Sequence, residues 1–150
     1  MKTLLVSVLL VGLALPAAAA DRTLIERAHA APLQVVAHCD SQSSRWEGGS
    51  IFTESDVSVL ETVRGVPGQR LVVRQRGGEV DGIGQRVTHV SLLKPGRTYL
   101  LLLTEDTAVN WVPIASGVKL VDVSAEGVQT VAGRPLAQVL AELRDLGGVD

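Results

Sequence analysis

Three neighbouring residues, His38, Cys39 and Asp40, are the first candidates for chemistry in this sequence. A thiol that lies beside an imidazole and a carboxylate can act as a nucleophile. The three residues end an apolar segment that predicts a β-strand, and successive side chains of a strand point to opposite faces. His38 and Asp40 then share one face and Cys39 lies on the other, so this segment alone cannot form a catalytic unit. We expect Cys39 to be a small buried hydrophobic residue.

A metal site would have to come from His29, His38, His89 and carboxylates, because Cys39 is the only cysteine. The sequence has no His-x-His, no His-Glu-x-x-His and no paired cysteines, which are the usual spacings of metal ligands. The stretch Asp81–Gly84 lacks the further residues of a phosphate or calcium loop and predicts a turn. We therefore expect no metal and no cofactor. One alternative stays open, a small metal-dependent hydrolase in which His38, His89 and nearby carboxylates converge.

Arginine and tryptophan residues are the candidates for binding. Arg74 and Arg76 fall on one face of a predicted strand, where Glu54, Asp56 or Glu79 could pair with them. Aromatic residues make up 3% of the chain and the net charge is −2, both of which argue against a nucleic-acid partner. An exposed tryptophan in a loop is a common contact in protein interfaces. The predicted contacts are Trp46, Arg74, Arg76 and Trp111, together with the loops Trp46–Ser50 and Gly77–Gly84.

The first twenty residues have the layout of a secretory signal peptide. Lys2 is followed by the apolar run Leu4–Leu15, then by Pro16 and by small residues up to Ala20. The run is shorter than the ~20 residues that cross a bilayer as a helix, so we expect no stable membrane span. Cleavage after Ala20 would leave a protein exported to the periplasm or out of the cell.

Length and composition indicate one folded domain over residues 21–150. The chain of 150 residues suits a single domain. Apolar residues make up 46% and charged residues 20%, which excludes a disordered chain. With one cysteine there is no intrachain disulfide, so stability must come from a hydrophobic core.

The sequence pattern after residue 20 is typical of a mainly β protein, with short apolar runs separated by Gly, Pro, Asn and Asp. Leu100–Leu103 is apolar on both faces, which predicts a central strand covered on both sides. The sequence therefore predicts a small closed or partly open antiparallel β-barrel, similar to the oligonucleotide-binding (OB) type. The predicted strands are Leu33–Asp40, Ile51–Val63, Gln69–Arg76, Arg86–Leu92, Thr98–Thr104, Asn110–Ser116, Val118–Ser124 and Val128–Ala132.

Two helices are predicted at the ends of this domain. Residues 135–146 carry leucine and valine at helical spacing on one stripe, with Pro135 in the first turn and Gly147-Gly148 after it. Such a helix is marginal alone, so it should dock its apolar stripe onto the sheet. Asp21–Ala30 predicts a short helix or turn.

A set of loosely spaced motifs resembles small exported bacterial domains that are often found near, or fused to, secreted metalloproteases. The order of the elements is more remotely similar to netrin-like modules and tissue inhibitors of metalloproteinases, which are OB-type barrels with flanking helices. The likeness spans Leu24 to Leu146. It is carried by Trp46, Ile51-Phe52-Thr53, Val57-Ser58-Val59, Glu61-Thr62-Val63-Arg64-Gly65, Gly77-Gly78-Glu79 and Pro95-Gly96-Arg97-Thr98-Tyr99-Leu100-Leu101.

The resemblance implies architecture more than activity. In the animal inhibitors an N-terminal cysteine chelates the zinc of the protease, whereas here the expected first residue is Asp21 and Cys39 is internal. The function we expect is a non-enzymatic exported module that binds a protein or peptide partner, with a secreted protease as the partner that the resemblance suggests. The alternatives are the metal-dependent hydrolase and a structural envelope component whose edge strand pairs with another copy.

Overall fold

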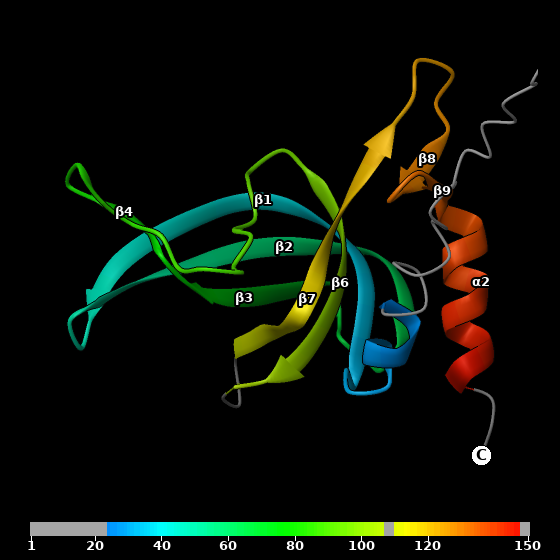
Figure 1. The fold of residues 1–150 in the computed structure, drawn as a ribbon, viewed down its shortest axis with the longest axis horizontal. Helices are drawn as coiled ribbons and strands as arrows, with labels where there is room; N and C mark the ends of the chain where they lie inside the picture. Colours follow the sequence, from blue (N-terminus) through cyan, green and yellow to red (C-terminus); the bar gives the residue numbers. More distant parts are fainter. Residues whose placement is uncertain (1–23, 107–109, 148–150) are drawn as a thin grey trace, which may run out of the picture.

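The computed structural model describes residues 24–106 and 110–147, and Figure 1 shows their arrangement. Residues 24–28 form a short helix, as the sequence predicts for this region, and the rest is mainly antiparallel β-structure closed by one C-terminal helix. The elements are β1 (Leu33–Glu47), β2 (Ser50–Arg64), β3 (Arg70–Arg76), β4 (Gly78–Val80), β5 (Ile83–Gln85), β6 (Thr98–Glu105), β7 (Asn110–Val123), β8 (Gln129–Val131), β9 (Arg134–Pro135) and α2 (Leu136–Gly147).

Five strands curl into a ring that is only partly closed. Their order is β3-β2-β1-β6-β7, and neighbouring strands in this order run antiparallel. The ring closes where β3 meets β7 in parallel, and this pairing covers only Val72 with Asn110 and Val73 with Trp111. The predicted mainly β, partly open antiparallel fold is confirmed as this partly closed ring.

Strand β6 lies in the centre of the sheet, as its apolar sequence predicts. Leu100 and Leu102 pack into one hydrophobic cluster, and Leu101 and Leu103 pack into a second cluster on the opposite face. All four side chains are fully buried. Period-two alternation thus places one strand between two cores.

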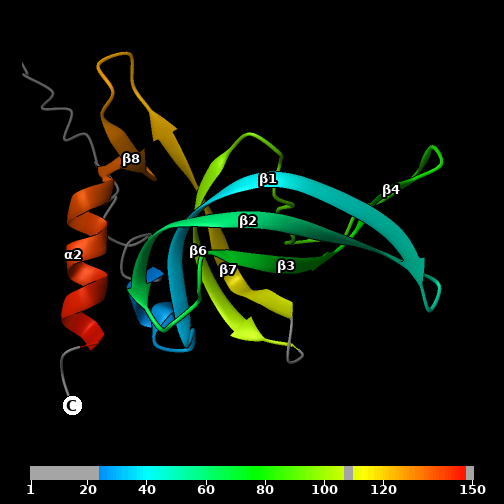
Figure 2. The same ribbon diagram turned by 180° about the vertical axis from the view of Figure 1, so that it is seen from behind.

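Helix α2 covers one face of the sheet, as predicted from its apolar stripe. Leu136, Val139, Leu140 and Leu143 are buried in the same cluster as Leu100 and Leu102 of β6. In Figure 2 the helix stands beside the sheet, on the side of β8. The helix begins at Leu136, because Pro135 pairs with Thr130 as the last residue of β9.

The two strands predicted at Asn110–Ser116 and Val118–Ser124 form one strand, β7. Its register against β6 shifts between Leu101 and Leu103, so residues 114–117 bulge out of the ladder. Gly117 sits where a Cβ atom would lie 2.5 Å from the Leu102 carbonyl oxygen. Gly117, which suggested a break between two strands, therefore allows the backbones of β6 and β7 to approach each other closely.

The prediction of a strand at Arg86–Leu92 is wrong. Residues 86–97 form an irregular connection from β5 to β6, and His89 has a φ of 65°. The side-chain amide of Gln75 donates to the Ser91 carbonyl (2.8 Å) and accepts from the Leu93 amide (3.0 Å). Side chains take the place of a neighbouring strand here, because no sheet edge pairs with this segment.

Beyond the pairing with β6, β1 and β2 extend as a ribbon on the left of Figure 1, and β3 pairs with β2 along it as far as Phe52. The predicted strand end at Asp40 is wrong, because β1 continues to Glu47 and meets β2 through a Gly48-Gly49 turn. Trp46 therefore lies on a strand and not in a loop. The predicted turn at Asp81-Gly82 is confirmed, since both residues have positive φ and join β4 to β5.

Some sequence predictions concern parts of the chain outside this description. The predicted signal peptide covers residues 1–20 and the predicted N-terminal helix begins at residue 21, so the first and the start of the second lie outside the described residues. Among the helices that are described, none has the length and apolar character needed to cross a membrane.

Candidate functional site

A groove lies where β3 and β7 stop pairing. Beyond Val73 and Trp111 the two strands diverge, and the middle of the irregular 86–97 connection forms a third wall. The groove encloses about 220 Å³. Its lining comes from three segments: Arg74, Gln75 and Arg76 of β3; His89, Val90 and Ser91 of the connection; and Val112, Pro113, Ile114, Ala115, Ser116, Gly117 and Val118 of β7.

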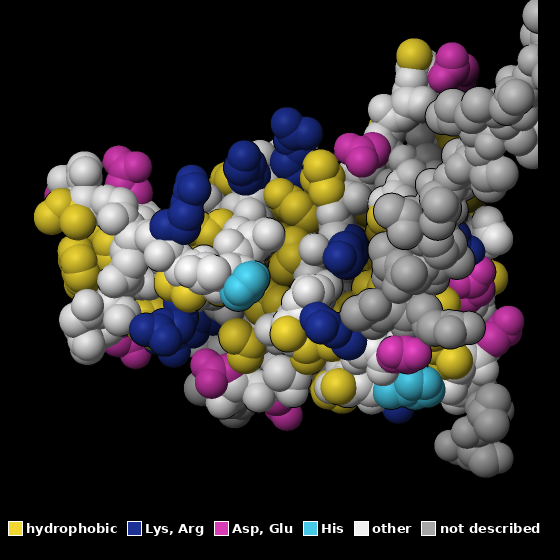
Figure 3. All heavy atoms as spheres, viewed as in Figure 1, with side chains coloured by type: hydrophobic (Ala, Val, Ile, Leu, Met, Phe, Trp, Pro, Cys, Tyr) yellow, Lys and Arg dark blue, Asp and Glu magenta, His cyan; other side chains and the backbone are white. Residues whose placement is uncertain are grey.

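The lining combines an apolar floor with a basic rim. The β7 side and Val90 supply apolar side chains, whereas Arg74, Arg76 and His89 supply the cationic or titratable groups. None of the lining residues is acidic. On the face seen in Figure 3, Lys and Arg side chains lie around hydrophobic ones, and most acidic side chains lie towards the margins.

The β7 wall is held by the N-terminal helix. Arg27 donates to the Ser116 hydroxyl (2.9 Å) and to the Ala115 carbonyl (3.4 Å). Ser116 has a φ of 59°, a conformation that non-glycine residues rarely adopt. Arg27 is thus a positioning residue, because it ties the bulge that lines the groove to a separate element.

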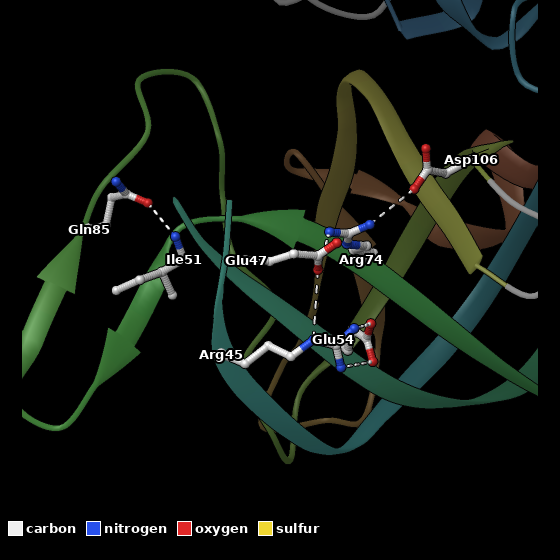
Figure 4. A network of polar contacts seen from close by, with 7 residues as sticks. All are labelled: Arg45, Glu47, Ile51, Glu54, Arg74, Gln85 and Asp106. Atoms are coloured by element: carbon white, nitrogen blue, oxygen red, sulfur yellow. Dashed lines mark hydrogen bonds and ion pairs between the residues drawn. The ribbon is translucent and has the colours of Figure 1, made fainter. Parts of the chain in front are cut away.

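Arg74 is held in a network of charges on the outer face of the ring (Figure 4). Its guanidinium lies 2.7 Å from a Glu47 oxygen and 3.6 Å from an Asp106 oxygen, and 4.0 Å above the Phe52 ring. Arg45 pairs with Glu54 (2.7 Å) in the same network. The predicted partners of Arg74 were Glu54, Asp56 or Glu79, so the partner is corrected to Glu47 and Asp106. Arg74 is therefore already neutralised.

Arg76 is the exposed arginine of the groove. It lies on the same outer face as Arg74, as predicted, and its guanidinium is 5.9 Å from the Phe52 ring. It donates to the Ser50 hydroxyl (3.3 Å), and no carboxylate among the described residues pairs with it. Its charge is consequently the one in the lining that a ligand can reach.

The two tryptophans have different environments. Trp46 is 47% exposed near the tip of the β1–β2 ribbon. It faces the same side as its partner Ile51, whose amide donates to the Gln85 side chain of β5 (2.6 Å, Figure 4). Trp111 is half-buried against the core cluster that contains Leu101. Of the four predicted binding residues, Arg74 and Arg76 line the groove, Trp111 precedes its β7 wall, and Trp46 belongs to the ribbon tip.

The segment His38–Asp40 does not form a nucleophilic unit. Cys39 is fully buried, as predicted, and its burial raises the pKa of the thiol, with Asp40 and Asp56 adding to the rise against a hydrogen bond to Ser55. His38 bonds the Thr98 hydroxyl (3.1 Å), and Asp40 accepts from Ser58. In the part of the chain that the structure describes, no three His, Cys, Asp or Glu side chains gather closely enough to share a metal ion.

Sequence reasoning missed the groove but one signal for it exists. Residues 82–104 contain Arg86, Lys94 and Arg97 and no acidic residue, and residues 110–121 contain Lys119 and no acidic residue. These two stretches include the connection and the β7 wall. A net negative chain thus concentrates positive charge around one face, which a scan for runs without Asp or Glu would have found.

Comparisons with protein-family models, with curated proteins and with solved structures find no match to this chain. The resemblance to exported bacterial domains and to netrin-like modules stays a prediction.

Proposed function

We propose that this protein is an exported, non-enzymatic module that binds a segment of a partner protein in the groove between β3 and β7. The observation that carries the proposal is the open seam of the ring. Two strand edges face each other there, pair over two residue pairs, and then separate around an apolar hollow.

An open seam of this kind is suited to an extended peptide. Unpaired strand edges offer backbone donors and acceptors, and hollows beside them select side chains. A hollow of about 220 Å³ is below the usual range for drug-sized ligands, which suits one or two anchoring side chains instead. The export that we expect from residues 1–20 places the partner in the periplasm or outside the cell. A secreted protease is the partner that the family resemblance suggests.

Groove filling tests the proposal. Ala115 lines the groove and is exposed, so Ala115→Phe should obstruct the hollow without disturbing the core. Ala141 is exposed on α2 and does not line the groove, so Ala141→Phe is the matched control.

Full-length protein exported by its own leader would serve as bait for envelope and culture fractions. We expect wild type and Ala141→Phe to capture the same partner and Ala115→Phe to lose it. Equal capture by all three proteins would refute binding in the groove.

A further inference from the structure

We propose that the partner segment in the groove is acidic, with an apolar side chain that fills the hollow and flanking carboxylates that meet the basic rim. This inference rests on the proposed function, and it names the chemistry of the occupant. It depends on charge complementarity between the groove and its surroundings.

The charge of the lining has one sign. Arg76 is exposed and bonded to a hydroxyl, His89 stands on the opposite wall, and no acidic residue takes part. Arg74 adds little positive charge to the groove, because Glu47 and Asp106 already neutralise its guanidinium. A carboxylate that reached Arg76 would replace a neutral hydroxyl partner with an ion pair, which a guanidinium can form through two parallel hydrogen bonds.

On the side of the connection, the surroundings of the groove carry the same charge, and the two exposed acids at its other edge, Glu47 and Asp106, pair with Arg74. Arg86, Lys94 and Arg97 are exposed on the connection that forms one wall, and Figure 3 shows Lys and Arg side chains across this face. The nearest acidic positions in the sequence of this wall are Asp81 and Glu105, outside the connection. An acidic segment would therefore be attracted before contact, whereas a basic segment would be repelled.

The floor explains why charge alone is not enough. Val90, Val112, Pro113 and Ile114 line a hollow that a purely acidic tail could not fill. Apolar anchors in well-packed pockets carry most of the binding energy of interfaces. The segment should thus alternate acidic residues with at least one aliphatic residue.

Three synthetic heptapeptides test this chemistry: Thr-Glu-Val-Leu-Val-Glu-Thr with blocked ends and a neutral fluorophore, and two versions with Gln or Lys in place of both Glu. We expect the Glu peptide to bind the exported protein about tenfold more tightly than the Gln peptide by fluorescence anisotropy. The Lys peptide should bind more weakly than both. Raising the salt from about 50 to about 500 mM should weaken the Glu peptide and leave the Gln peptide nearly unchanged.

Two variants test which arginine attracts the Glu peptide. Arg76→Gln should remove most of the preference for the Glu peptide, because Arg76 is the accessible arginine of the rim. Arg70 lies on the same strand and is also exposed, yet it does not line the groove, so Arg70→Gln should keep the preference.

Three outcomes would overturn the inference. If the Glu and Gln peptides bind equally and Ala115→Phe abolishes both, the groove binds peptides but does not select acidic ones, and the proposed function stands. If no peptide binds at about 1 mM, an acidic segment is excluded as the occupant, and the capture experiment alone decides the function. If the protein is a dimer that Ala115→Phe dissociates, as seen by light scattering, a second copy covers the groove.

Discussion

Individual residues in this protein act mainly through what they let the backbone do. Gly117 allows β7 to approach the Leu102 carbonyl, and Arg27 then holds the bulge that follows from it. The residues that looked reactive in sequence, His38 and Cys39, are bound into the strand structure. Single residues therefore shape the wall of the groove, and the described side chains give no sign of covalent chemistry.

Gly117→Ala should destabilise the protein by about 1–3 kcal/mol. The added Cβ would meet two backbone atoms, the Leu102 oxygen at 2.5 Å and the Ile114 oxygen at 2.9 Å, which cannot turn aside as a side chain would. Urea unfolding measures the change. Gly84→Ala is the control, because a Cβ there meets nothing within 4 Å, and it should change the free energy of unfolding by less than about 0.5 kcal/mol. Equal effects of both variants would contradict the close approach.

Cys39 should be protected from thiol reagents in the folded protein. Because it is fully buried, its reaction with a disulfide reagent at pH 8 should be on the order of a hundredfold or more slower than in denaturant. A fast reaction in the folded state would mean that the thiol is accessible.

Ionisation of the same thiol also links stability to pH. Burial raises the pKa of Cys39 in the folded state, so above about pH 8.5 the unfolded chain loses a proton that the folded chain keeps. The free energy of unfolding should therefore fall as pH rises from 8 to about 9.5. Cys39→Ala should make this slope shallower, whatever its effect at pH 7. An unchanged slope would show that the thiol does not contribute.

At the level of elements, the sequence pattern correctly predicted structure that depends on one segment. It failed where the structure depends on two segments that are distant in the sequence. The apolar run Leu100–Leu103 and the stripe of α2 each carry their burial in their own spacing, and both predictions are confirmed. Arg86–Leu92 has the composition of a strand, but strands need a neighbouring edge, and here the Gln75 side chain bonds Ser91 and Leu93 instead. Asp40–Glu47 has the composition of a loop, yet it is a strand because β2 pairs with it.

The same distinction applies to the candidate site. The shared face of Arg74 and Arg76 follows from period two within β3 and is confirmed. The groove depends on where β3 and β7 separate, and no sequence window contains both strands. The exposure of Trp46 could be inferred from the residues beside it in the sequence. The burial of Trp111 depends on core residues that are distant in the sequence.

Helix α2 should stabilise the fold mainly through its apolar stripe, with Arg144 also paired to Glu61 of β2. Leu140 is buried against the sheet, so Leu140→Ala should lower the free energy of unfolding by about 2–4 kcal/mol. Gln138 is exposed on the same helix, so Gln138→Ala should change it by less than about 0.5 kcal/mol. Thermal unfolding followed by circular dichroism measures both. A small effect of Leu140→Ala would indicate a weakly docked helix.

Over the whole molecule, β6 joins two cores into one structure. One cluster holds α2 and the other holds the inner faces of β1, β2 and β3, and the side chains of β6 alternate between them. Neither core can lose β6 without the other losing it too. The described residues should therefore unfold as a single unit.

Leu101→Ala and Leu102→Ala test this coupling, since one side chain belongs to each cluster. Each should destabilise the protein by about 2–5 kcal/mol, and each should do so in one transition. In a Trp46→Phe background, Trp111 fluorescence reports the cluster of Leu101, and far-ultraviolet circular dichroism reports α2. The two signals should share one midpoint in both variants. Loss of the helical signal at lower denaturant in Leu102→Ala alone would show that the two cores unfold separately.

The parallel contact between β3 and β7 gives the seam a polarity. Both strands point the same way where they meet, so a chain inserted between them in the reverse direction would be antiparallel to each neighbour at once. Antiparallel ladders are slightly more stable per residue than parallel ones. The seam would then distinguish a peptide from the same residues written backwards, although composition and charge are identical.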